Sequence, residues 1–200
     1  MKTKLACVAL LGAAVFGACQ AQAAEMIFTE TATANGSLNG VVFSNKLITI
    51  TGEADTNGIH SLTAGVYRIE NVPLSLTIQG MATVHFTDEM YVVSNQNNHF
   101  AGFIDLTHNS NALLFASQID NATYDLGAPF GPVTGVGGVG LPMTYATDGG
   151  GFKLTNPPRS VTFQAMLAPV PEPATWLMML GGLGALGAVL RRRREALVIA

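Results

Sequence analysis

The sequence predicts an all-β protein, an antiparallel β-sandwich ectodomain with an N-terminal signal helix and a C-terminal single transmembrane helix. Short runs of alternating apolar and polar residues fill the middle of the chain, and no helical period is found before Pro173. The chain is 48% hydrophobic and only 12% charged, whereas roughly a quarter of the residues of a soluble protein are charged. The apolar excess lies at the two ends, so the ends are treated separately from the fold.

Period-2 alternation indicates strands that bury one face and expose the other. It is clearest at residues 74–79, 82–87 and 160–167, and the first two runs flank Gly80-Met81, which predicts a hairpin. Residues 128–147 carry no charge and are rich in glycine and proline. They predict a long loop with at most a short edge strand. Further short strands are expected at residues 27–33, 41–43, 47–51, 66–69, 90–93, 103–106, 113–116 and 152–154. About 8 to 11 short strands separated by turns favour a β-sandwich.

The N-terminus, residues 1–23, has the pattern of a secretory signal peptide. A short basic region is followed by an apolar run and then by Ala21 and Ala23, small residues at the −3 and −1 positions of a cut before Ala24. Signal peptidase is therefore an expected partner. Lipoprotein processing at Cys19 is the alternative. Cleavage after Ala23 would leave an ectodomain, residues 24–168, without cysteine and hence without disulfides.

The C-terminal segment, residues 169–200, predicts a membrane anchor. Residues 174–190 carry no charge and would form a helix of about 26 Å, at the short end of what spans a bilayer. Pro171 and Pro173, one on each side of Glu172, force an extended stretch before this helix. A cluster of cations follows the helix and should stay in the cytoplasm, which places the ectodomain outside. This cluster consists of Arg191, Arg192, Arg193 and Arg194.

In this order, Pro171-Glu172-Pro173, an apolar span and an arginine cluster resemble the PEP-CTERM sorting signal of Gram-negative bacteria. The resemblance implies an exosortase-type processing enzyme as partner and cleavage near Pro-Glu-Pro. It further implies inner-membrane anchoring before processing, and then the cell surface or the exopolysaccharide matrix. The module occurs on unrelated ectodomains, so it indicates the address of the protein and not its activity.

The ectodomain offers little sign of catalysis or of a cofactor. Its four basic residues face eleven acidic ones, which argues against nucleic acid as a ligand. No histidine pair has metal-ligand spacing, and the common hydrolase motifs are absent. Asp105 and His108 could act together as acid and imidazole, but solvent-exposed histidines are the simpler expectation. Residues 55–58 are read as an Asx-type turn and not as a calcium loop. We expect no enzyme, metal or cofactor.

Three functional hypotheses remain. The leading one is a non-enzymatic surface or matrix component that makes weak contacts with exopolysaccharide through polar strand faces. The second is a carbohydrate-binding module, for which Tyr67, Tyr91, Tyr124 and Tyr145 are the candidates for stacking on sugars. The third is a secreted enzyme. Thr29, Thr31 and Thr33 share one strand face, as in ice-binding rows, but without an internal repeat they are expected to be ordinary solvent-facing threonines.

Overall fold

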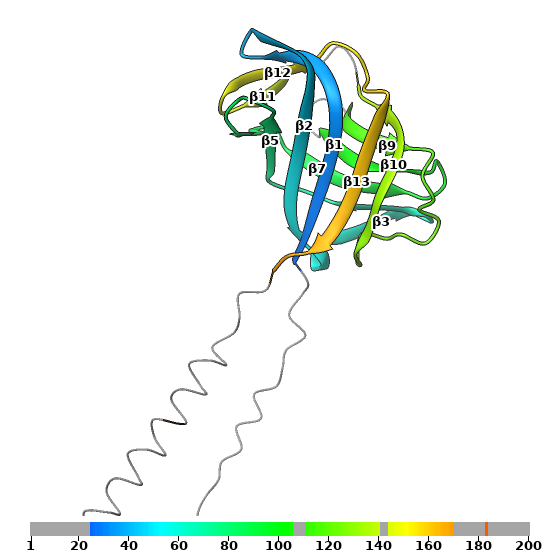
Figure 1. The fold of residues 1–200 in the computed structure, drawn as a ribbon. Coiled ribbons are helices and arrows are strands. Elements are labelled where there is room, and N and C mark those ends of the chain that lie inside the picture. The colour runs from blue at the N-terminus through cyan, green and yellow to red at the C-terminus, as the bar shows by residue number, and fades with distance from the viewer. Residues whose placement is uncertain (1–24, 106–110, 141–143, 170–182, 184–200) are drawn as a thin grey trace, which may run out of the picture.

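The computed structural model describes residues 25–105, 111–140, 144–169 and 183, and its strands form one antiparallel sheet. The order along the main path is β3-β4-β7-β8-β9-β10-β13-β1-β2-β5-β6, and β12 joins both β1 and β11 (Figure 1). Within residues 25–105, 111–140 and 144–169, the one helical element is the 3₁₀ turn η1 (Thr56–Gly58). The strands are β1 (Glu25–Leu38), β2 (Val41–Asp55), β3 (Ile59–Thr63), β4 (Val66–Ile69), β5 (Leu74–Ile78), β6 (Val84–His85), β7 (Met90–Asn95), β8 (Phe100–Asp105), β9 (Asn111–Ser117), β10 (Phe130–Gly138), β11 (Tyr145–Thr147), β12 (Gly150–Leu154) and β13 (Ser160–Leu167).

The long hairpin of β1 and β2 is the spine of the sheet. Its turn is Asn39-Gly40, where both residues have positive φ angles of 49° and 78°, the backbone that a two-residue hairpin turn requires. The first half of β1 pairs with β13, and its last residues pair with β12. Along one edge, β1 therefore pairs first with β13 and then with β12. This change of partner helps the sheet to bend.

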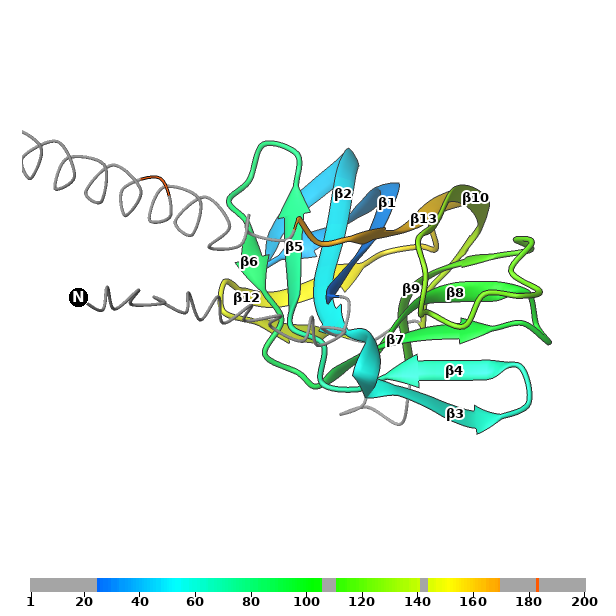
Figure 2. The ribbon, with the colours of Figure 1, turned by 90° about the horizontal axis from the view of Figure 1, so that it is seen from below.

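The sheet curls so that its two halves face each other. Seen from below, β3, β4, β7 and β8 lie on one side and β1, β2, β5 and β6 on the other, with the two sets of strands crossing steeply (Figure 2). A single apolar core fills the inside, with Phe28, Ile50 and Phe163 from one half and Val92 and Phe103 from the other, all fully buried. Alternation along β1, β5 and β13 thus gives this half of the sheet one buried and one solvent-facing surface.

The prediction of an all-β, antiparallel ectodomain is confirmed, but the strands do not form the two separate sheets of a sandwich. They form one continuous hydrogen-bonded sheet that bends over itself. The predicted hairpin around Gly80-Met81 is confirmed by the pairing of β5 with β6. The two strands predicted within residues 41–51 are one long strand, β2, and β3 and β11 were not predicted.

The prediction of a long loop at residues 128–147 is wrong, because β10 is an inner strand between β9 and β13. Its glycines are the reason. A Cβ atom at Gly135 would lie 2.1 Å from the Ser117 carbonyl oxygen, and one at Gly137 would lie 2.2 Å from that of Pro158. The strand needs glycine where its neighbours approach closely, and glycine is also the residue that sequence rules assign to loops.

Several predictions concern residues that the structure does not describe. The signal peptide, residues 1–23, lies outside the described ranges, as does the predicted span 174–190 except for Leu183. Within the part of the chain that is described, no helix has the length and apolar character needed to cross a bilayer.

Candidate functional site: a threonine ladder and a polar groove

Five threonines from five neighbouring strands stand opposite one another on the outer face of the sheet. The Thr134 and Thr162 hydroxyls are hydrogen bonded at 2.7 Å, and at the other end the Thr77 hydroxyl is bonded to that of Thr83 at 2.8 Å. All five side chains are half-buried or exposed. We call this set the threonine ladder; in the order of the strands it consists of Thr134, Thr162, Thr31, Thr49 and Thr77.

A second row of uncharged polar residues runs beside the threonine ladder. Gln164, Thr29, Thr51 and Ser75 are paired across four strands, two residues along from the ladder. Neighbouring strands lie about 4.8 Å apart, and residues two apart in a strand about 6.7 Å. The two rows together form a continuous surface of hydroxyl and amide groups that carries no formal charge. Such groups both donate and accept hydrogen bonds, as a polyol ligand does.

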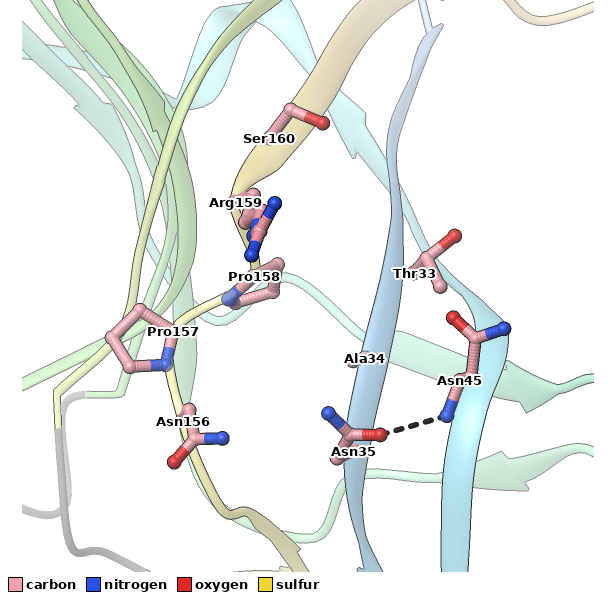
Figure 3. Close-up of a pocket in the computed structure, with 9 residues that line it drawn as sticks. All are labelled: Thr33, Ala34, Asn35, Asn45, Asn156, Pro157, Pro158, Arg159 and Ser160. Atoms are coloured by element: carbon pink, nitrogen blue, oxygen red, sulfur yellow. Dashed lines mark hydrogen bonds between the residues drawn. The ribbon is translucent and has the colours of Figure 1, made fainter.

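A polar groove lies at the end of this face, between β1, β2 and the connection from β12 to β13. Its volume is about 490 Å³, within the range of ligand sites. Thr33 and Ser160 line the groove and also end the outer face, so the groove continues the surface of the threonine ladder. Figure 3 shows nine lining residues, among which Arg159 is the one with a charge.

The Asn35 carboxamide of the groove is held by local hydrogen bonds. Asn35 Oδ1 accepts from the Ser44 hydroxyl at 2.9 Å and from the Asn45 backbone N–H at 2.7 Å. This contact lies at an irregularity in the pairing of β1 with β2, and Asn45 has a φ of 51°, which asparagine tolerates better than most residues. The Asn35 carboxamide is therefore fixed, with its nitrogen left for a ligand.

The opposite wall is built from a rigid proline pair. Pro157 and Pro158 fix the backbone before β13, and Pro158 is buried. The Gly137 N–H donates to the Arg159 carbonyl at 3.3 Å, which ties this wall to β10. Arg159 and Asn156 are exposed and face the Asn35 and Asn45 side across the groove (Figure 3).

An acid–imidazole pair is formed on the surface of the described structure by His85 and Asp148. His85 Nδ1 lies 3.0 Å from Asp148 Oδ2, and the His85 backbone N–H donates to Asp148 Oδ1 at 2.8 Å. These bonds lower the pKa of the Asp148 carboxyl. Both side chains are more than half exposed. Asp105 is buried at the end of β8, while His108 lies outside the described residues.

Ser75, the hydroxyl residue paired with His85 in the sheet, is not placed as a nucleophile for this surface pair. Ser75 is the cross-strand partner of His85, but its hydroxyl donates to the Thr51 carbonyl at 3.4 Å and is not aimed at the imidazole. Residues 55–58 form the predicted Asx-type turn, in which the Asn57 N–H donates to Asp55 Oδ1 at 2.7 Å. In the described ranges, no group of three or more histidine, cysteine or acidic side chains could hold a metal ion.

The tyrosines are poorly placed for stacking on sugar rings. Tyr124 and Tyr145 are 4% and 2% exposed, and Tyr124 stacks on Phe130 with ring centroids 4.2 Å apart. Tyr145 donates to the Ala112 carbonyl at 2.9 Å, and burial raises its pKa to about 12. The Arg68 guanidinium covers the Tyr91 ring at 4.9 Å. Tyr67 and Tyr91 are half-buried, and Tyr67 packs against the apolar core.

The C-terminal end of the ectodomain leads into the sorting segment. β13 ends at Leu167, and Pro171, Glu172 and Pro173 follow outside the described residues, as do Arg191 to Arg194. Residues 169–194 match the family model of the PEP-CTERM protein-sorting motif. The chain is thus a protein with a PEP-CTERM sorting motif. The sequence resemblance, which rested on Pro-Glu-Pro, the apolar span and the arginines, is thereby confirmed.

The motif gives this PEP-CTERM protein an exported, cell-surface destination and an exosortase-type processing enzyme as partner. The match spans 26 residues at one end of the chain and does not extend to the ectodomain. No curated protein and no solved structure matches the chain. The function of the ectodomain must therefore be argued from its own residues.

Sequence reasoning found only part of the candidate site of this PEP-CTERM protein. It placed Thr29, Thr31 and Thr33 on one solvent-facing strand face, which the structure confirms. It did not find the ladder, because its members come from five separate strands and meet only through the register of the sheet. The groove was missed for the same reason, since Asn35 and Asn156 lie far apart in the sequence.

Proposed function

We propose that this PEP-CTERM protein is a non-enzymatic component of the cell surface or extracellular matrix that associates with exopolysaccharide. The threonine ladder and its neighbouring row carry this proposal. They present uncharged hydroxyl and amide groups over several adjacent strands. Such a surface can form many weak hydrogen bonds to the hydroxyl groups of a polysaccharide. The exposed His85–Asp148 pair, with no nucleophile aimed at it, supports a binding role and not a catalytic one.

The curvature of the sheet favours a flexible ligand. Neighbouring strands are rotated by about 20–25°, so the threonine ladder turns by roughly 80–100° over its four steps. A flat crystalline surface cannot follow such a turn, whereas a polysaccharide chain can bend with it. The proposal therefore takes a single hydrated polysaccharide chain as the ligand.

The route to the surface forms the second part of the proposal. Signal peptidase removes residues 1–23 by cutting between Ala23 and Ala24, or lipoprotein processing occurs at Cys19. The span 174–190 then holds the protein in the inner membrane until an exosortase acts near Pro171-Glu172-Pro173. Mass spectrometry of the mature protein from cell and matrix fractions locates both ends. Intact Arg191 to Arg194 on all surface copies would reject processing.

The binding part is tested by removing hydroxyls from the threonine ladder. The triple variant T31V/T49V/T162V keeps β-branched side chains of similar shape but loses three hydroxyls at the centre of the ladder. Expressed as the full chain in the producing cells, it should leave the matrix fraction for the culture medium. The matched control is T63V, an exposed threonine on the edge strand β3 and outside the ladder.

Two results would contradict the proposal. One is a triple variant that stays in the matrix to the same extent as the control. The other is a wild-type protein that does not co-sediment with isolated exopolysaccharide. A carbohydrate-binding module that stacks sugars on tyrosine is the weaker candidate, because Tyr124 and Tyr145 are buried, Arg68 lies over one face of the Tyr91 ring, and Tyr67 packs against the core. Loss of glycan-array binding on Tyr67→Ala would promote it.

A further inference from the structure

The basic residues of the ectodomain gather at the groove. Arg159 lines it. Lys153 pairs with Ser37, two residues along β1 from Asn35, and is exposed. Lys46 directly follows the lining residue Asn45. The fourth basic residue of the described ranges, Arg68, lies on β4 and forms an ion pair with Glu70.

The acidic residues lie elsewhere. No carboxylate is among the residues that line the groove, although the ectodomain holds eleven acids against four bases. Glu25, Glu53 and Asp55 are instead at the opposite end of the β1–β2 hairpin, where Glu25 pairs with Asp55 and Glu53 with Ile27. The two ends of the same pair of strands therefore carry opposite charge.

The cations at the groove are not neutralised within the described structure. Among the described residues, ion pairs are formed by Arg68 and His85 and not by Arg159, Lys153 or Lys46. An arginine near the fixed carboxamide of Asn35 is well suited to an external carboxylate, because its planar guanidinium can donate two parallel hydrogen bonds to the two oxygens. The Asn35 and Asn156 amides on the two walls can bond the hydroxyls that neighbour such a carboxylate on a sugar ring.

We propose that the groove binds a carboxylate-bearing sugar unit of an acidic polysaccharide, with Arg159 on the carboxylate and Asn35 and Asn156 on the adjacent hydroxyls. This inference rests on the proposed function and names the class of polysaccharide. Lys153 adds positive potential at the side of the groove. The threonine ladder, which is continuous with the groove through Thr33 and Ser160, carries the uncharged part of the polymer away from it.

The position of the groove fits this use. Glu25 and Ala168 meet at one end of the sheet, where the Ala168 N–H donates to the Glu25 carbonyl at 2.7 Å, and the chain continues from there to the sorting motif (Figure 1). The groove is at the far end of β1, about 27 Å from Met26 for eight residues of strand. A protein attached through its C-terminal side thus presents the basic groove away from the attachment.

The test compares polysaccharides that differ in charge. The full chain, purified in detergent micelles, is titrated with polygalacturonate and with neutral dextran at low and high salt. Wild type should bind polygalacturonate at least tenfold more tightly than dextran, and salt should weaken the binding. R159Q should lose at least tenfold of the polygalacturonate affinity. R68Q, which removes the same charge at a site away from the groove, should keep it. Unfolding temperatures of both variants confirm that they are folded.

Each outcome decides the inference. It is overturned if R159Q binds polygalacturonate as tightly as wild type does, if dextran binds equally well, or if polyglutamate binds more tightly than polygalacturonate, which would indicate an acidic protein partner. Binding that is indifferent to R159Q but is lost in T31V/T49V/T162V would overturn this inference and leave the proposed function intact. Failure of wild type to bind either polysaccharide would overturn both.

Discussion

Glu30 is a carboxyl group in the middle of an apolar core. It lies on the inner face of β1, between its cross-strand partners Ile50 and Phe163, and is fully buried. Neither carboxyl oxygen accepts a hydrogen bond of ordinary geometry from the described residues. Burial raises the pKa of Glu30 well above its ordinary value, and the Phe103 backbone N–H opposes this shift only in part.

The raised pKa makes stability depend on pH with a definite sign. In the unfolded chain a glutamate has a pKa of about 4.3. Above that pH the unfolded chain releases the Glu30 proton while the folded protein keeps it, so the folded state binds more protons. The free energy of unfolding therefore falls as pH rises, by about 1.4 kcal/mol per pH unit, until the pKa of the folded state is passed. A rise of two pH units within this range lowers the free energy of unfolding by about 2.7 kcal/mol.

Glu30→Gln removes the titration and keeps the shape of the side chain. At pH 4.5 the variant and wild type should have similar stability, since both side chains are then neutral in the folded protein. At higher pH the variant should be the more stable, by about 1.4 kcal/mol per unit until the folded-state pKa of Glu30 is passed, which corresponds to about 2–4 °C in Tm per kcal/mol for a chain of this size. Urea unfolding at pH 4.5, 5.5 and 6.5 measures the difference.

Glu53→Gln is the matched control, because Glu53 is an exposed carboxyl on the neighbouring strand β2. Its stability difference from wild type should not grow in this way with pH. The reasoning would be refuted if Glu30→Gln and wild type kept the same difference in stability from pH 4.5 to 6.5, or if the variant became the less stable of the two at the higher pH.

Three further predictions follow from other contacts. Asn121 is 1% exposed and donates to the Ser94 hydroxyl and the Phe100 carbonyl, so Asn121→Ala should lower the free energy of unfolding by about 1–3 kcal/mol in urea; an unchanged midpoint would contradict this. Gly135→Ala places a methyl group against the Ser117 carbonyl and should cost about 1–3 kcal/mol, whereas Gly80→Ala, with open space around it, should not create such a clash. The hydrogen bonds from His85 lower the pKa of Asp148. Their contribution to stability is therefore present above the pKa of Asp148 in the unfolded chain and is lost as pH falls through its pKa in the folded protein. His85→Ala should move the Asp148 titration, followed by NMR of the carboxyl carbon, to higher pH, and an unchanged titration would refute the assignment.

The predictable part of the fold is the part that local pattern determines. The alternation at residues 74–78 and 160–167 fixed which side chains are buried, and the Asx turn after Asp55 formed as expected. β10 escaped prediction because its glycines serve close contacts between strands, which leave no local sign that differs from that of a loop.

The candidate site was harder to predict because it depends on register. Thr31 meets Thr162 and Thr49 only after β1 has paired with β13 and β2. A shift of one residue in either pairing would turn the hydroxyls toward the core. Register over such sequence distances is set by the packing of the whole core, so a single sequence does not reveal the ladder or the basic end of the hairpin.

The location of the groove also determines how the molecule would carry mechanical load. β13 begins at Ser160, on the groove, and ends at Leu167, two residues before the sorting motif. When a polymer pulls on Arg159 while the C-terminal side is held, tension passes along the covalent backbone of this one strand. β1 and β10 flank β13 on either side, but because both points of load would lie at the two ends of β13, the hydrogen bonds to these neighbours would carry little of the tension. If the groove binds a polymer as proposed, the pull would thus bypass the rest of the sheet.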